Sequence, residues 1–313
     1  MIRPYDVSVQ VLDDTDVRRR LQPAMAIGAV RECLAAEQSG GLIAPARVRA
    51  GLGGGDIIFT AGRVTGTGYG FRVYDTLPTA EDDQLTVVYD DGTGRIAGAV
   101  AGTYLGGART GAIGAVAVDL LADPAADTLG LIGTGRQAYF QLWAIRAVRA
   151  LLEVRVYGRD PARCSAFAQR ARAELGLPVT GVAGPREAVT GAGIVVLATT
   201  SRQPVIDSGW VRDGAHVTTL GPKEAGAHEC PVGLAGRAGA IVTDSLAQVD
   251  SYPHPFFLDG TEHRERMSPL AASLAGAGPV RRQPGEITLF CSVGLAGTEV
   301  AVAAALLRGP GSR

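Results

Sequence analysis

Apolar residues follow two different spacings in the first 122 residues of the chain. A helical spacing, with apolar residues three and four positions apart, covers Asp16–Leu21 and a longer stretch that Pro23 opens and that runs to about Gln38. Short apolar runs come next and predict strands, two of which flank the turn sequence Asp90–Gly94, as in a hairpin. A further helix is predicted from Ala108 to Leu121. The predicted strands, which we expect to form an antiparallel sheet, cover residues 56–60, 69–74, 85–89 and 95–100.

From Thr128 onward the pattern changes, because short buried strands now alternate with helices. This alternation predicts an α/β fold with a Rossmann-type doubly wound parallel sheet, next to an α+β first domain. We place the domain boundary at Asp123-Pro124, so that residues 1–122 form the first domain and residues 123–285 the dinucleotide-binding domain. Residues 286–313 carry an apolar helix through Leu307, and we expect them to return to the first domain. The strands predicted in this half cover residues 128–132, 153–157, 193–198, 216–220 and 240–243.

Composition excludes several classes of protein. The 313 residues are 46% hydrophobic and carry a formal net charge of −1, which fits two globular domains and argues against nucleic acid as a partner. The first residues lack the features of a signal peptide, and no apolar run reaches the length of a membrane span. The four cysteines are scattered without metal-ligand spacing, so we expect buried thiols, no metal site and a cytoplasmic protein.

The most informative motif follows the first strand of the second domain. It reads Gly133-Thr134-Gly135-Arg136-Gln137-Ala138 and stands between a predicted strand and a predicted helix, as in dinucleotide-binding folds. Gly133 permits the sharp turn, Gly135 lets a pyrophosphate approach the backbone, and Ala138 permits close packing of helix and strand. The N–H groups at the start of the helix then face the phosphates. We expect Gly133, Thr134, Gly135, Arg136 and Gln137 to contact the cofactor.

The end of the second strand bears on the choice of nicotinamide cofactor. NAD-binding folds place an acidic residue there for the ribose hydroxyls, but this chain has Tyr157, followed by Gly158, Arg159 and Asp160. The Arg159 guanidinium matches a 2′-phosphate, and Asp160 is better placed to cap the helix that Pro161 opens. The sequence therefore favours NADP, with NAD as the alternative. Ligands of such sheets bind at the carboxyl ends of the strands, here marked by Gly133, Arg159, Thr199 and Gly221.

Several segments together resemble the ornithine cyclodeaminase/mu-crystallin family and lie in the family's order over nearly the whole chain. The resemblance implies a homodimer whose first domain, with the C-terminal tail, forms the dimer interface and the floor of the substrate site. It also implies NAD(P)-dependent work on amino, keto or imino acids. The segments are Pro45-x-Arg47, Tyr69–Arg72, Arg109–Ala112, Gly133–Ala138, Ala198–Ser201 with Pro204-Val205, and Ser292–Ala296.

The resemblance also assigns residues. Arg47 and Arg109 stand at two family arginines that bind the substrate carboxylate, and Arg72 replaces a family lysine with the same role. Lys223 stands at the position of the catalytic aspartate if no gap is introduced, and Glu224 stands there after a slip of one residue. A family acidic residue near the cofactor falls loosely on Glu299. The cofactor residues implied in this way are Thr199, Thr200, Ser201, Gly221, Val293 and Gly294.

We interpret the chain as an NADP-dependent oxidoreductase that reduces the C=N or C=O group of a small imino or keto acid, such as pyrroline- or piperideine-2-carboxylate. Arg47, Arg72 and Arg109 would bind the carboxylate, and Lys223 would bond the nitrogen or oxygen on the reacting carbon, which makes Lys223 and Arg72 the catalytic candidates. Lys223 has an alternative, in which it turns outward and pairs with Glu224 or Glu229. Two other functions stay open: redox-neutral cyclodeamination of ornithine or lysine, and NADPH binding with little turnover.

Overall fold

The computed structural model describes residues 9–78, 83–279 and 285–309. The chain divides into two compact units, which we call the N-terminal unit (residues 1–109 and 296–313) and the central unit (residues 110–295). The first division falls inside helix α3 (Tyr104–Leu121) rather than at Asp123-Pro124. The sequence pattern marks the end of that helix, whereas the packing of its two halves decides which unit each half joins.

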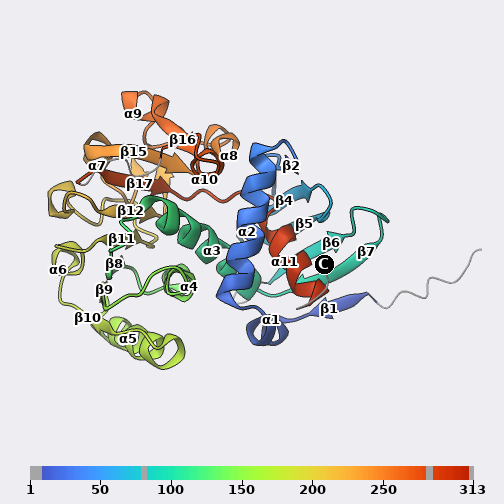
Figure 1. Cartoon of the computed structure of the whole chain (residues 1–313), viewed down its shortest axis with the longest axis horizontal. Coiled ribbons are helices and arrows are strands. Elements are labelled where there is room, and N and C mark those ends of the chain that lie inside the picture. The colour runs from blue at the N-terminus through green and yellow to red at the C-terminus, as the bar shows by residue number, and fades with distance from the viewer. Residues whose placement is uncertain (1–8, 79–82, 280–284, 310–313) are drawn as a thin grey trace, which may run out of the picture. The chain divides into compact units, whose positions relative to one another are not determined.

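A seven-stranded sheet forms the centre of the N-terminal unit (Figure 1). The strand order is β1-β7-β6-β5-β4-β2, with β3 also paired to β4, and all neighbours are antiparallel except β1 and β7. The four predicted strands correspond to β4–β7, and their antiparallel pairing is confirmed. The strands are β1 (Gln10–Leu12), β2 (Leu42–Ile43), β3 (Val48–Gly51), β4 (Asp56–Val64), β5 (Gly68–Asp75), β6 (Gln84–Tyr89) and β7 (Ile96–Ala101).

Helix α11 (Thr298–Arg308) packs on β4–β7 and against α2 (Pro23–Gln38), while α1 (Asp14–Arg20) lies beside β1 and β7. The close approach of α11 depends on glycine, because a Cβ at Gly62 would collide with the backbone of Gly297. The face of the sheet that α11 covers carries both apolar and polar buried side chains. Its polar members include Thr60, Arg72 and Thr86, which lie opposite one another on β4, β5 and β6.

Helix α3 begins four residues earlier than the sequence predicts. The carboxylate of Asp14 accepts hydrogen bonds from the backbone N–H groups of Thr103 and Tyr104, at 3.2 and 2.9 Å, and so caps the helix from a distant element. Arg109 therefore lies in the second turn of α3 and not at its start, which corrects the predicted boundary. The capping residue is about 90 positions away in sequence, so no local pattern indicates it.

The central unit holds an eight-stranded parallel sheet in the order β10-β9-β8-β11-β12-β17-β15-β16, which confirms the predicted doubly wound α/β fold (Figure 1). Strand β17 pairs with β12 and β15, so the first part of the tail belongs to this sheet, and the chain returns to the N-terminal unit only from Ala296. The strands are β8 (Thr128–Ile132), β9 (Glu153–Tyr157), β10 (Val179–Gly181), β11 (Ile194–Leu197), β12 (His216–Thr219), β15 (Ala238–Thr243), β16 (Met267–Pro269) and β17 (Ile287–Cys291), with a separate hairpin of β13 (Lys223–Glu224) and β14 (Ala227–His228).

Buried aliphatic residues such as Val195, Val217 and Leu289 form the core of this unit. Cys33 in the N-terminal unit and Cys164, Cys230 and Cys291 in the central unit are buried free thiols, as predicted. Within the described ranges, no helix combines the length and apolar character that crossing a bilayer requires. The helices are α4 (Arg136–Ile145), α5 (Pro161–Leu175), α6 (Pro185–Val189), α7 (Val232–Arg237), α8 (Leu246–Asp250), α9 (Glu262–Glu265) and α10 (Leu270–Leu274), with a 3₁₀ turn at Ser208–Trp210.

Candidate functional site

A pocket of about 570 Å³ lies at the carboxyl ends of β8, β9 and β11. The structure brings seven of the predicted cofactor residues to its walls, while Arg136 and Gln137 begin helix α4 beside it and are not among its lining residues. Such an edge is where doubly wound sheets bind their ligands. The predicted residues that line the pocket are Gly133, Thr134, Gly135, Arg159, Thr199, Thr200 and Ser201.

The glycine turn suits the approach of a phosphate. Gly133 has a φ of +117°, and a Cβ there would collide with the carbonyl oxygen of Ala198, so the turn needs glycine. Gly135 is the N-cap of α4, is exposed, and has no atom within 4 Å of where a Cβ would stand. The pocket wall is thus open backbone at the start of a helix, which fits the pyrophosphate of a dinucleotide.

The end of β9 carries two arginines rather than one. Asp160 accepts hydrogen bonds from the N–H groups of Ala162 and Arg163, at 2.9 and 3.2 Å, so its predicted role as the cap of α5 is confirmed. Arg159 and Arg163 both line the pocket, and both are exposed. Sequence reasoning missed Arg163, although its place in the first turn of α5, four residues after Arg159, is a local signal that could have revealed it. Two guanidiniums at this strand end fit a phosphate group.

Glu229 is buried beside the pocket, and its carboxylate accepts hydrogen bonds from two loops. The sequence did not indicate this role. Oε2 of Glu229 accepts from the N–H and the hydroxyl of Thr199, at 2.8 and 2.7 Å. Its Oε1 accepts from the Thr219 hydroxyl and from the N–H groups of Leu220 and Gly221, at 2.9, 3.0 and 2.5 Å. One carboxylate therefore ties the loop after β11 to the loop after β12.

Lys223 is 1% exposed, and its ammonium donates a hydrogen bond to the carbonyl oxygen of Gly221 at 2.7 Å. The outward orientation considered for Lys223 is therefore wrong. Burial lowers the pKa of Lys223 below its ordinary value, and the nearby groups Glu229, Cys291, Asp244 and Cys230 only partly oppose this. The structure thus directs the ammonium into the central unit.

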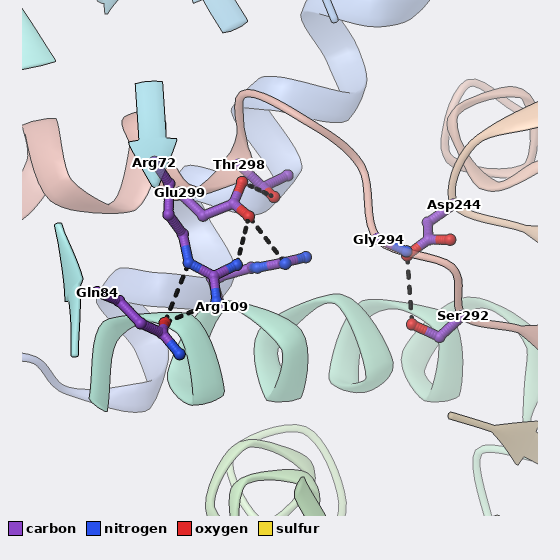
Figure 2. A network of polar contacts seen from close by, with 8 residues as sticks. All are labelled: Arg72, Gln84, Arg109, Asp244, Ser292, Gly294, Thr298 and Glu299. Atoms are coloured by element: carbon purple, nitrogen blue, oxygen red, sulfur yellow. Dashed lines mark hydrogen bonds and ion pairs between the residues drawn. The ribbon is translucent and has the colours of Figure 1, made fainter. Parts of the chain in front are cut away.

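The predicted cofactor residues Val293 and Gly294 lie beyond the end of β17, where a second buried carboxylate orders the backbone. Asp244 accepts from the N–H group of Val293 at 2.7 Å. It also accepts from the Gly294 N–H at 2.8 Å and from the Ser292 hydroxyl at 3.2 Å, and Figure 2 shows these three residues together. Gly294 has a φ of +88°, a conformation that favours glycine. Asp244 follows β15 directly, so its position at a strand end is a signal that the sequence analysis did not use.

In the N-terminal unit, Glu299 joins two of the predicted substrate arginines. Its Oε1 is 2.8 Å from Nη2 of Arg109 and 3.2 Å from Nη1 of Arg72, and Figure 2 shows both guanidiniums turned toward it. Arg72 also donates from Nε and Nη2 to Oε1 of Gln84, at 3.1 and 2.6 Å, and stacks over the ring of Tyr74. These contacts hold the planar guanidinium of Arg72 in one orientation.

The Glu299 carboxylate interacts electrostatically with all three arginines that are predicted to bind the substrate. Burial alone raises the pKa of the Glu299 carboxyl, but Arg109, Arg72 and Arg47 together hold it below its ordinary value of 4.5. Three guanidiniums near one carboxylate provide charged hydrogen-bond donors, which suit an anionic ligand.

Comparison with known proteins places these features in a wider context. A model of the ornithine cyclodeaminase/mu-crystallin family matches residues 8–308. The chain is 33% identical over 203 residues to a putative dehydrogenase of Rhizobium meliloti, a match that covers 64% of this chain and 61% of that protein. It is 32% identical over 238 residues to a Δ1-pyrroline-2-carboxylate reductase of Bacillus cereus, with 73% of each chain covered.

Solved structures resemble the fold over almost its whole length. The Thermococcus litoralis Δ1-pyrroline-2-carboxylate reductase, solved with NADH and L-proline, superposes with a TM-score of 0.87 at 26% identity and covers 95% of this chain and 96% of its own. An archaeal alanine dehydrogenase dimer with bound NAD gives a TM-score of 0.87 at 27% identity, with 96% and 95% coverage.

Proposed function

The chain belongs to the ornithine cyclodeaminase/mu-crystallin family, and we propose that it is an NADP-dependent oxidoreductase that reduces the C=N or C=O group of a small imino or keto acid. The observation that carries the proposal is the pairing of two features. The central unit has a glycine-lined pocket at the ends of its parallel strands, and the N-terminal unit has a cluster of arginines around Glu299. Relatives named as Δ1-pyrroline-2-carboxylate reductases support this reaction class.

In this proposal, Gly133, Thr134 and Gly135 form the backbone cradle for the pyrophosphate, and Thr199–Ser201 form the opposite wall. Arg159 and Arg163 bind the 2′-phosphate that distinguishes NADP from NAD. When bound, the nicotinamide supplies the hydride. The solved relatives that hold NADH or NAD make NAD the alternative cofactor.

Arg47, Arg72 and Arg109 bind the carboxylate of the substrate. Glu299 and Gln84 fix the direction of the Arg72 guanidinium before the substrate arrives, which reduces the entropy lost on binding. A carboxylate fixed in this way orients the adjacent carbon for hydride transfer. Lys223, whose buried ammonium donates to the Gly221 carbonyl oxygen, is in this proposal the hydrogen-bond donor to the nitrogen or oxygen on the reacting carbon.

The charge balance favours an imine or ketone over an amino acid as the substrate to be bound. The arginine cluster repels an ammonium group, whereas an imino or keto acid presents a carboxylate without one. We therefore place cyclic ketimines, such as pyrroline- or piperideine-2-carboxylate, first among the substrates. Cyclodeamination of ornithine or lysine comes second, because the family name includes ornithine cyclodeaminase and a solved lysine cyclodeaminase has a similar fold.

The test is NADPH consumption, followed by absorbance, with a panel of cyclic imino acids and 2-keto acids. The proposal expects turnover with at least one cyclic imino acid, and slower turnover or none with free amino acids. Ammonia released from ornithine or lysine without net change of cofactor would instead establish cyclodeamination. Tight NADPH binding without turnover on any member of the panel would establish a cofactor-binding protein.

We also propose that the protein is a homodimer formed through the outer face of the seven-stranded sheet. Val48, Phe59, Val73 and Leu85 form a row across β3–β6 on that face, and Val48, Phe59 and Leu85 are 62%, 39% and 38% exposed. A contiguous exposed apolar surface is typical of a protein interface, and the archaeal alanine dehydrogenase is a dimer. Sedimentation equilibrium of the wild type and of Phe59→Lys tests this: a monomeric wild type would contradict it.

A further inference from the structure

Glu229 is fully buried, and the function proposed above gives its side chain no contact with cofactor or substrate. Two of the five hydrogen bonds that its carboxylate accepts nevertheless come from Thr199, a residue in the wall of the cofactor pocket. Oε2 holds the N–H and hydroxyl of Thr199, and that hydroxyl accepts a bond from the Ser201 N–H at 3.1 Å. Thr199 and Ser201 both line the pocket. The Glu229 carboxylate therefore sets the turn that forms one pocket wall.

The backbone of Glu229 reaches the same pocket at a second point. Its carbonyl oxygen accepts a hydrogen bond from the N–H of Val205 at 2.9 Å, and Val205 lines the pocket. Its own N–H donates to the carbonyl oxygen of Pro222 at 3.2 Å. Glu229 is thus bonded to the loop after β11 through both its carboxylate and its carbonyl oxygen. It is bonded to the loop after β12 through its carboxylate and its N–H.

The packing between the two loops leaves little room for adjustment. A Cβ at Gly221 would collide with the carbonyl oxygen of Thr199 and with the Glu229 carboxylate, so only glycine fits there. The Gly221 N–H donates to Glu229, and the Gly221 carbonyl oxygen accepts from the Lys223 ammonium. The Lys223 ammonium also interacts electrostatically with the Glu229 carboxylate.

We propose that Glu229 is a positioning residue for cofactor binding, which acts by holding Thr199 and Val205 in the pocket wall through its carboxylate and backbone. The inference rests on the proposed function, because it takes the pocket to be the nicotinamide cofactor site. A carboxylate is required because donors converge on both of its oxygens, whereas glutamine would present an N–H₂ group to one set of donors. The loss of those bonds would let the Thr199–Ser201 wall relax.

The experiment measures the dissociation constant of NADPH by fluorescence titration, together with the melting temperature, for the wild type and for Glu229→Gln. We expect Glu229→Gln to weaken NADPH binding roughly tenfold or more, since bonds to a charged acceptor are lost. At saturating NADPH, the turnover number and the substrate KM should stay within about threefold of wild type, because the arginine cluster is untouched.

A matched pair of milder variants separates positioning from general destabilisation. Thr219→Val removes one hydroxyl that donates to Glu229. Thr218→Val removes the neighbouring hydroxyl on the same strand, which bonds His216 at 3.0 Å and not Glu229. Both residues are fully buried, so both variants lose a buried hydrogen bond. We expect roughly two- to fivefold weaker NADPH binding for Thr219→Val, and a change of less than about twofold for Thr218→Val.

Wild-type affinity for NADPH in folded Glu229→Gln would overturn the inference. If Glu229→Gln does not fold, Thr219→Val decides: equal effects of Thr219→Val and Thr218→Val on NADPH affinity would overturn it as well. A wild type that binds neither NADPH nor NADH would overturn the proposed function itself, and the inference with it. The first two results leave the proposed function standing, so the failures are distinguishable.

Discussion

Two buried glutamates, one in each unit, satisfy their carboxylates in opposite ways. Glu229 in the central unit accepts five hydrogen bonds from backbone N–H groups and hydroxyls. Glu299 in the N-terminal unit is paired with the guanidiniums of Arg72 and Arg109. The Glu229 carboxylate interacts with dipoles and fixes the conformation of the main chain. The Glu299 carboxylate interacts with full charges and fixes the orientation of side chains.

The difference matches what each unit is proposed to bind. A dinucleotide is recognised largely by the main-chain N–H groups of the protein, so its pocket needs loops in a fixed conformation. A small acid is recognised by charge, so its site needs cations with a fixed direction. The difference between the two carboxylates also predicts unequal losses of unfolding free energy on mutation. An uncompensated buried charge destabilises the folded state more than an unpaired buried dipole does.

The largest effect should come from Glu299→Gln, which removes the buried carboxylate that pairs with two buried guanidiniums. Breaking a buried ion pair from one side costs about 3–5 kcal/mol of unfolding free energy. Urea denaturation of the variant and the wild type measures this. Asp56→Asn is the control, because it removes an exposed ion pair with Arg49 and should cost less than about 1 kcal/mol. Equal losses for the two variants would erase the distinction between the two kinds of site.

The pH dependence of the unfolding free energy tests the contribution of ionised Glu299 separately. The folded pKa of Glu299 lies below its ordinary value of 4.5, so its ionised form stabilises the folded state above pH 4.5. That contribution should be constant from neutral pH to about pH 5, and should be lost as the pH falls through the depressed pKa. Unfolding free energies of wild type and Glu299→Gln, measured from pH 7 to pH 3, should therefore converge at the acid end. A difference that widens with acid would reverse the assigned sign.

Arg109→Met tests whether this charged cluster serves a ligand as well as the fold. If Arg109 binds the substrate carboxylate, the variant should raise the substrate KM about tenfold or more, which corresponds to at least about 1.4 kcal/mol. NADPH affinity should stay unchanged, because Arg109 is not among the residues that line the cofactor pocket. Steady-state kinetics with saturating NADPH give the KM. An unaltered KM in a folded protein would remove Arg109 from the site and leave Glu299 with a structural role alone.

The smallest effect is expected at Arg159, because its charged side chain is exposed. Arg159→Ala should weaken NADPH binding several-fold and leave NADH binding nearly unchanged, since only NADPH carries the 2′-phosphate. Its melting temperature should match that of the wild type, because Arg159 is exposed. Arg163→Ala is the companion variant at the same strand end. Equal losses for NADPH and NADH would contradict the assignment of Arg159 to the phosphate.

Local patterns determined much of this protein. The alternation of strand and helix after Thr128 sufficed for the doubly wound sheet, because hydrophobic periodicity is a property of neighbouring residues. The turn at Gly133 and the cap at Asp160 were likewise readable, since both act within a few residues of their partners. The arginines at positions 47, 72 and 109 were found through the resemblance of their segments to a family, and their role in binding substrate stays a prediction.

Only the tertiary structure decided what holds those residues. Glu299 lies 227 positions from Arg72, and Asp14 lies 90 positions from the Tyr104 N–H group that it caps, so no local window contains either pair. The burial of Lys223 and the five bonds of Glu229 arise where parallel strands that are distant in sequence end side by side. The same geometry placed β17 between β12 and β15. Long-range pairing carries no periodic signal of its own, because it depends on which surfaces meet after the elements have formed.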